Sequence, residues 1–350
     1  MNKCIFIFIL TTFLSSCAST KEFKISDINI QKFPSNSIND LEFDSKGNSW
    51  MVSTGGNLIK FKNEKIIKTF NNDNSDIKYT YIEDIAIDKS DNIWIASGHL
   101  IKFNDKDWVH FNELDGFKIK FPDQLFIDNL DRVWFVNKYS KGISFLENGK
   151  LKNDFIEKNP ILKKGLGSNK VYFFSENNIW TSSREMIFHY DGKKWNEYPN
   201  SFFNGSSYNY VKTLHNGSEK YWLGTWHKGL VSVDKKSLEF TMIDLTLSDS
   251  DSKFLKGAKA HQYWNGKIDI DQVSQVNSDK LYITSIAEKN NILYIGTKYN
   301  GLIIKANNHV YNLNPKNSEI LSESINTIKI DFENKIWIGT DKGLNILSYE

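Results

Sequence analysis

One motif, a Trp or Tyr between apolar residues, returns seven times along this chain of 350 residues. A polar turn that often begins with Asp precedes it, and Gly-Thr or other small residues follow it. The central aromatic residues are Trp50, Trp94, Trp134, Trp180, Trp222, Tyr294 and Trp337. Five of the six intervals lie between 40 and 46 residues, the length of a four-stranded propeller blade. The spacing therefore predicts an all-β fold, a seven-bladed β-propeller with four-stranded antiparallel blades.

In the second strand of each repeat, the residues that point to either face of the sheet are apolar, as in Ile93-Trp94-Ile95 and Ile336-Trp337-Ile338. A sheet with one wet face does not tolerate this pattern, whereas blades packed between two neighbours bury both faces. The seventh copy reaches Glu350 after its third strand. We therefore expect residues 23–33 to supply the fourth strand and close the ring, which removes the open sheet edge.

One interval, the 72 residues from Trp222 to Tyr294, departs from the repeat. The excess is too short for another four-stranded blade, so it predicts an inserted loop at about residues 245–279. Loops of this length are frequently functional. A lid over the central depression and a segment packed on the ring are the two interpretations of this loop, and both stay open.

The first sixteen residues have the features of a secretory leader. Lys3 precedes an apolar run from Ile5 to Leu10 that is too short to span a bilayer. Leu14-Ser15-Ser16 then stands directly before Cys17. This ending resembles the bacterial lipoprotein box, in which the leader is cut before the Cys and its sulfur is lipidated.

We therefore divide the chain into a lipoprotein signal peptide at 1–16, the lipidated Cys17 with a short tether at 17–22, and the propeller at 23–350. The mature domain then holds no free thiol, because Cys4 leaves with the leader. The predicted location is the bacterial cell envelope, lipid-anchored, on the periplasmic side or at the cell surface, with the outer membrane favoured.

Charge and motifs exclude several classes of partner. The formal net charge is only +2, and no Lys/Arg run alternates with aromatic residues, so we expect no nucleic acid partner. No phosphate-binding or dinucleotide loop occurs, so we expect no cofactor. The turn aspartates suit hairpin turns, and the seven histidines lack metal-ligand spacing, so we expect no metal site. The oligomeric state stays open, and a monomer is compatible with the sequence.

Three copies carry a resemblance to a known family. They read Ile-Trp-Ile-Gly-Thr-Asp-Lys-Gly-Leu at 336–344, Tyr-Trp-Leu-Gly-Thr-Trp-His-Lys-Gly-Leu at 221–230, and Leu-Tyr-Ile-Gly-Thr-Lys-Tyr-Asn-Gly-Leu at 293–302. These segments resemble two-component-regulator propeller repeats. Such repeats usually form periplasmic sensor regions of hybrid histidine kinases, often thought to sense carbohydrate. The resemblance implies a sensor-like binding propeller, here in a stand-alone lipoprotein form without kinase domains.

In propellers, the loops after the second strand and those that enter the first strand share the face that commonly holds the ligand. Aromatic and charged residues of these loops suit a polar ligand with sugar rings or carboxylates, because rings stack and charged donors orient. The candidate binding residues on this top face are Tyr139, Arg184, Trp226, His227, Lys298, Tyr299 and, on the inserted loop, Trp264.

The preferred hypothesis is a non-enzymatic propeller that binds a glycan, a peptide or a partner protein of the envelope. A polysaccharide lyase or glycoside hydrolase is the first alternative, in which His227, Tyr299 and Arg184 would transfer protons and stabilise charge. Propeller enzymes draw single catalytic residues from several blades, so the absence of a contiguous catalytic motif is only weak evidence against an enzyme. A scaffold for an envelope protein complex is the second alternative.

Overall fold

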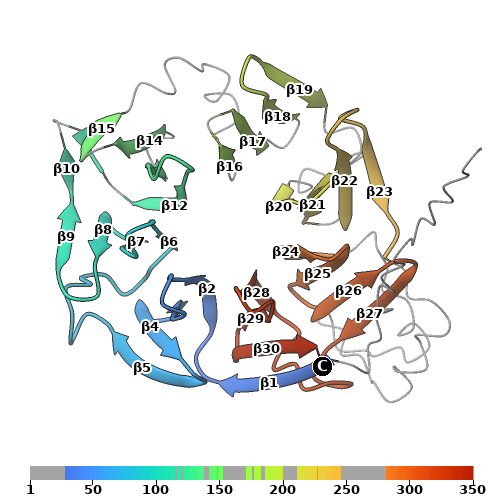
Figure 1. The fold of residues 1–350 in the computed structure, drawn as a ribbon, viewed down its shortest axis with the longest axis horizontal. Helices are drawn as coiled ribbons and strands as arrows, with labels where there is room; N and C mark the ends of the chain where they lie inside the picture. Colours follow the sequence, from blue (N-terminus) through green and yellow to red (C-terminus); the bar gives the residue numbers. More distant parts are fainter. Residues whose placement is uncertain are drawn as a thin grey trace, which may run out of the picture.

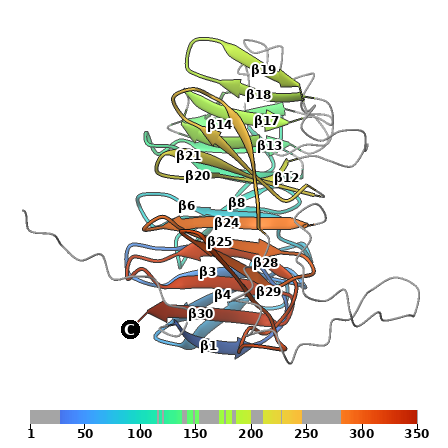
Figure 2. The same cartoon turned by 90° about the vertical axis from the view of Figure 1, so that its right-hand side faces the viewer.

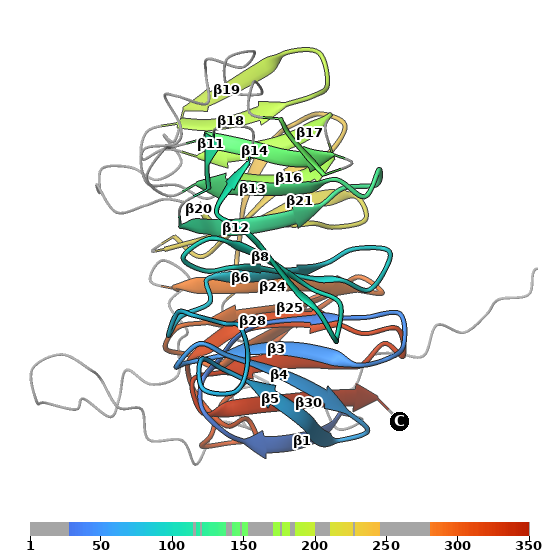
Figure 3. The same ribbon diagram turned by 90° about the vertical axis from the view of Figure 1, so that its left-hand side faces the viewer.

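The computed structural model describes residues 28–349, except for 115–116, 120, 138–141, 148, 153–170, 176, 183–185, 200–210, 227 and 246–280. These residues form seven four-stranded antiparallel sheets in a ring, and one two-stranded sheet. Figure 1 looks down the ring axis, and Figures 2 and 3 show the strands running between the two faces of the disc. Within the described ranges there is no helix, hence none able to cross a bilayer. The predicted seven-bladed propeller is confirmed.

We number the blades 1 to 7 from the blade of β2, with strands in order from the centre outward. The innermost strands are β2 (Ile38–Phe43), β6 (Asp84–Ile87), β12 (Pro122–Ile127), β16 (Val171–Ser175), β20 (Val211–Asn216), β24 (Ile283–Lys289) and β28 (Ile325–Ile330). The second strands are β3 (Ser49–Ser53), β7 (Ile93–Ala96), β13 (Val133–Asn137), β17 (Asn178–Ser182), β21 (Lys220–Thr225), β25 (Ile292–Thr297) and β29 (Ile336–Thr340).

The third strands are β4 (Asn57–Lys62), β8 (Leu100–Phe103), β14 (Gly142–Glu147), β18 (Met186–Tyr190), β22 (Leu230–Asp234), β26 (Leu302–Ala306) and β30 (Gly343–Tyr349). The outer strands are β5 (Lys65–Phe70), β9 (Trp108–Phe111), β15 (Lys150–Lys152), β19 (Trp195–Pro199), β23 (Phe240–Ile243), β27 (His309–Leu313) and β1 (Ile28–Pro34). A short hairpin of β10 (Glu113–Leu114) and β11 (Phe117–Lys118) follows blade 2.

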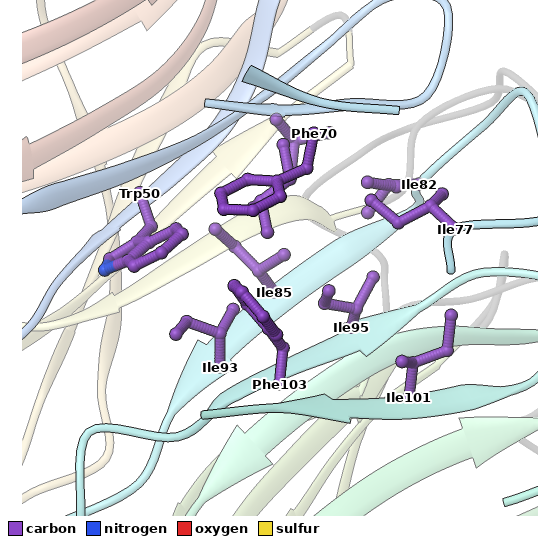
Figure 4. Close-up of a cluster of buried hydrophobic side chains, with 11 residues drawn as sticks. Trp50, Phe70, Ile77, Ile82, Ile85, Ile93, Ile95, Ile101 and Phe103 are labelled. Atoms are coloured by element: carbon purple, nitrogen blue, oxygen red, sulfur yellow. The ribbon is translucent and has the colours of Figure 1, made fainter. Parts of the chain in front are cut away.

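The core lies between the blades. Every residue of β3 and of β29 is buried, which confirms that the second strands are covered on both faces. Trp50 of blade 1 stacks on Phe70 of its own blade at 6.1 Å between ring centroids and meets Phe103 of blade 2 edge-on at 5.9 Å. Ile85 and Ile93 of blade 2 complete this cluster (Figure 4). Each blade is therefore stable only against its neighbours.

An Asp at the start of the first hairpin turn organises four blades. Its Oδ1 accepts the backbone N–H groups two and four residues later, and its Oδ2 accepts the indole Nε1–H of the Trp six residues later. The Nε1–Oδ2 distances are 3.0 Å for Trp50 and Asp44, 2.9 Å for Trp94 and Asp88, 2.9 Å for Trp134 and Asp128, and 2.7 Å for Trp337 and Asp331. One carboxylate thereby fixes both the turn and the tryptophan that packs on the next blade.

The N-terminal strand closes the ring. β1 pairs antiparallel with β30, from Ile28 opposite Tyr349 to Pro34 opposite Gly343. Blade 7 is thus built from both ends of the chain, as Figure 1 shows. The predicted closure is confirmed for residues 28–33, and residues 23–27 of the predicted strand lie outside the described residues.

Hydrogen bonds between innermost strands join neighbouring blades at the centre. In each case a side-chain oxygen accepts a backbone N–H of the following blade. These bonds run from Ile85 to Asp40 (3.3 Å), from Leu125 to Asp84 (2.8 Å), from Val171 to Gln124 (2.9 Å) and from Ile328 to Ser285 (2.9 Å). The four acceptors occupy equivalent positions in their strands.

We expect Asp88→Ala to lower the free energy of unfolding by about 2–3 kcal/mol, because it leaves the buried Trp94 indole and two turn amides without an acceptor. Urea denaturation measures the change. Asp73→Ala, in an exposed turn, is the control and should stay within about 0.5 kcal/mol of the parent. Equal losses in the two variants would contradict the structural role of Asp88.

Candidate functional site

The loops that follow the second strands and the loops that enter the innermost strands lie on one face of the ring, here called the loop face. In three blades, a backbone N–H of the first loop donates to a carbonyl of the second. These bonds join Thr54 to Ser37 (3.1 Å), Lys298 to Tyr282 (2.9 Å) and Asp341 to Ser324 (3.3 Å). The two kinds of loop therefore share a face in these blades, as expected for a propeller.

Three of the predicted binding residues, Trp226, Lys298 and Tyr299, are described by the structure and lie in loops of blades 5 and 6. The other four lie outside the described residues: Tyr139, Arg184, His227 and Trp264. The same holds for Cys17 and for the inserted loop after Leu245.

Trp226 and Tyr299 meet through a third aromatic residue, Tyr282. The ring of Trp226 lies 4.9 Å from that of Tyr282 at an angle of 69°, and Tyr282 lies 5.1 Å from Tyr299 at 79°. We call these three residues the aromatic cluster. Edge-to-face contacts of this kind favour fixed angles between rings. The side chain of Tyr299 is 55% exposed, so the cluster reaches solvent between blades 5 and 6.

The Gly-Thr-x-x-x-Gly motif shapes both loops that carry the cluster. Thr225 Oγ1 donates to the carbonyl of Gly229 at 2.9 Å, and Thr297 Oγ1 donates to that of Gly301 at 2.8 Å. Both glycines have positive φ, 67° and 74°, a conformation that other residues adopt at a cost. The motif thus closes a compact turn and leaves the intervening side chains, among them Trp226 and Tyr299, to vary.

Two lysines border the aromatic cluster. Lys212 Nζ lies 5.6 Å from the centroid of the Trp226 ring, a cation–π distance. Lys298 Nζ donates to Ser324 Oγ of the loop that enters blade 7, at 3.0 Å. Burial, and then the neighbouring Tyr299, raise the pKa of Tyr282 further above its ordinary value. Rings, a phenol and ammonium groups together suit a ligand that carries both rings and negative charge.

A second polar group lies on the loop face at blades 1 and 2. Tyr79 meets Tyr81 at 5.8 Å and His99 at 5.6 Å between ring centroids. His99 Nε2 and His110 Nδ1 are 2.6 Å apart and share a hydrogen bond, while His110 Nε2 is buried without a hydrogen-bond partner. The sequence offered no reason to pair these histidines, which lie on opposite sides of a hairpin.

Both imidazoles of this pair resist protonation. Burial, and then the charges of His110 and Lys78, lower the pKa of His99 to about 4. Burial also lowers the pKa of His110, where nearby Asp76 opposes the shift and Lys78 adds to it. The pair is therefore neutral at pH 7.

The innermost strands place an ion pair near the ring centre. Lys329 of β28 is paired with Glu42 of β2. Burial raises the pKa of Glu42 despite this partner. Burial opposes the charge of Lys329, but Glu42, Asp40 and Asp84 outweigh it and raise the lysine pKa. In the part of the chain that the structure describes, no three His, Cys, Asp or Glu side chains are arranged to hold a metal ion.

Comparison with known proteins defines the fold. The extracellular domain of the hybrid two-component system protein BT3049 from B. thetaiotaomicron matches with a TM-score of 0.65 and 19% identity, over 91% of this chain and 41% of that one. The corresponding domain of BT4673 matches with a TM-score of 0.65 and 17% identity, over 93% of this chain and 40% of that one. Streptogramin B lyase matches with a TM-score of 0.62 and 12% identity, over 93% of this chain and 99% of that one. No protein-family model and no curated protein matches the chain.

These similarities show a seven-bladed propeller whose structural neighbours include extracellular domains of two-component system proteins. The chain spans about two fifths of the length of those two domains. At such low identity the likeness establishes the fold alone, and a lyase shares it as closely as a two-component protein does.

The histidine pair predicts a loss of stability in acid. The pKa of His99 in the folded chain, about 4, is below its ordinary value of 6.5. The unfolded chain therefore binds more protons at His99 between these values, and this residue alone should lower the free energy of unfolding by roughly 3 kcal/mol from pH 6.5 to pH 4. Urea denaturation at pH 7 and pH 4.5 measures this. His99→Gln should make the dependence shallower without abolishing it, because burial also lowers the pKa of His189 to about 4. The exposed His309→Gln should leave the dependence unchanged, and identical slopes in both variants would refute the assignment.

Proposed function

We propose that this protein is a lipid-anchored binding propeller of the bacterial cell envelope that recognises an anionic glycan on its loop face. The observation that carries the proposal is the aromatic cluster of Trp226, Tyr282 and Tyr299. Lys212 lies over the Trp226 ring, and Lys298 is bonded through its backbone N–H to the carbonyl of Tyr282. Aromatic rings stack on the apolar faces of sugars, and lysine ammonium groups pair with carboxylates or sulfates.

A glycan array and thermal-shift titration of the protein test the binding site. We expect Trp226→Ala and Tyr299→Ala each to weaken binding about 10- to 100-fold, because aromatic anchors dominate the energy of such contacts. Phe332→Ala is a matched control, since this ring is 76% exposed in the turn between β28 and β29 at the other end of the strands. A hit that survives both loop-face substitutions would overturn the placement.

The same experiments separate the remaining functions. We expect Lys298→Gln to weaken binding of the charged glycan and to reduce its dependence on salt. Release of unsaturated products from uronate polymers would instead indicate a lyase. Recovery of one stoichiometric protein from native membranes, without glycan binding, would indicate a scaffold or peptide-binding role.

The anchor is the second part of the proposal. It is supported by Leu14-Ser15-Ser16 directly before Cys17. Structural neighbours that are extracellular domains are consistent with an envelope location. We expect the full chain expressed in a bacterium to enter the detergent phase on Triton X-114 separation and to incorporate a clickable fatty acid. Cys17→Ser should abolish both, and persistence of the fatty acid in that variant would exclude Cys17 as the anchor.

A further inference from the structure

The outer strand of blade 1 exposes two adjacent isoleucines. The first four residues of β5 are all exposed, and Ile66 and Ile67 are each 57% exposed. Among the described residues, no other two consecutive large apolar side chains are exposed to this extent. Two adjacent exposed isoleucines on an outer edge strand are an aggregation hazard unless something covers them.

A β-bulge is the local cause. Phe61 of β4 pairs with Ile66, whereas the preceding Lys60 pairs with Lys68, so Ile67 has no partner in the register. In a regular strand, successive side chains point to opposite faces and one of the two isoleucines would face a neighbouring blade. The extra residue redirects the strand and leaves both apolar side chains in solvent.

Lysines flank the exposed pair. Lys65 and Lys68 stand on either side of it and are both exposed, and Lys62 lies at the end of β4. Lysines alone would suffice to protect an edge strand from aggregation, so they do not account for the isoleucines. Apolar side chains framed by lysines are typical of surfaces that insert into a lipid headgroup layer, where the ammonium groups meet phosphates.

The N-terminal strand places this surface near the predicted anchor. Gln31 Nε2 of β1 donates to Glu64 Oε1 in the turn between β4 and β5 at 2.9 Å, and Phe33 meets Phe61 edge-on at 5.3 Å. Figures 1 and 3 show β1 and β5 side by side on the rim of the disc. Only ten residues lie between Cys17 and Ile28, and the eleven Cα–Cα steps that join the two span at most about 40 Å.

We propose that Ile66 and Ile67, with Lys62, Lys65 and Lys68, form a contact surface for the phospholipid bilayer, so that the disc stands on its edge on the membrane. The inference rests on the proposed lipidation of Cys17. In this orientation both faces of the ring open sideways into the aqueous phase, and the aromatic cluster stays accessible to a soluble or surface glycan.

The test uses the full lipidated chain in vesicles of phosphatidylethanolamine and phosphatidylglycerol. Because Cys17 would carry the lipid and Cys4 would leave with the leader, Ile67→Cys offers one thiol for an environment-sensitive fluorophore. Glu197→Cys is the matched control, an exposed residue on the outer strand β19 across the ring. We expect lipid-attached quenchers to reduce emission at position 67 several-fold more than at position 197.

A second variant excludes an effect of labelling. With the fluorophore at Lys65→Cys, the double substitution Ile66→Ser and Ile67→Ser should remove most of the quenching while thermal unfolding stays unchanged. Equal quenching at positions 67 and 197, or quenching that survives the double substitution, overturns the contact in a protein that still enters the detergent phase. A protein that stays in the aqueous phase overturns the anchor and the contact together, which distinguishes the two failures.

Discussion

The hydrogen bond between a turn aspartate and a tryptophan indole is the contact on which the blade interfaces depend. In blades 1, 2, 3 and 7 the same carboxylate holds the first hairpin turn and the Trp that packs on the following blade. A turn is a local structure, whereas a blade interface is a long-range one. Because one group serves both, formation of the turn also sets the direction of the indole that builds the interface.

Ring closure gives each blade a neighbour on both sides, and the contacts between blades depend on this. A blade buries its second strand only when both neighbours are present, as the fully buried β3 and β29 show. The side-chain acceptors Asp40 and Asp84 then tie successive innermost strands together. The pairing of β1 with β30 joins the two ends of this series, because β1 completes blade 7 and leads directly into β2 of blade 1.

Much of this architecture could be predicted because it repeats. The spacing of the Trp residues predicted the number of blades. Apolar residues at both odd and even positions of the second strands predicted that these strands are buried on both faces. The absence of a fourth strand in the last repeat predicted that the N-terminal segment closes the ring. The candidate site does not repeat. Tyr282 and Lys212 precede or begin innermost strands where no motif marks them, and His99 meets His110 only across a folded hairpin. The sequence was enough to predict that Trp226 and Tyr299 lie on one face of the ring. That both contact Tyr282 depends on how blades 5 and 6 pack together, which the sequence does not reveal.

Two of the blades that depart from the aspartate–tryptophan pattern, blades 5 and 6, carry the candidate site. In blade 5 the residue six positions before Trp222 is Asn216 instead of an aspartate, and the indole Nε1–H of Trp222 donates to Glu288 Oε2 of blade 6 at 2.6 Å. Ser218 Oγ donates to the other oxygen of the same carboxylate at 2.7 Å. A bond within one blade is thereby replaced by bonds between two, and these are the two blades that carry the aromatic cluster. Fixing their relative position at the opposite end of the strands restricts the distances between Trp226, Tyr282 and Tyr299, which is the pre-organisation that a binding face requires.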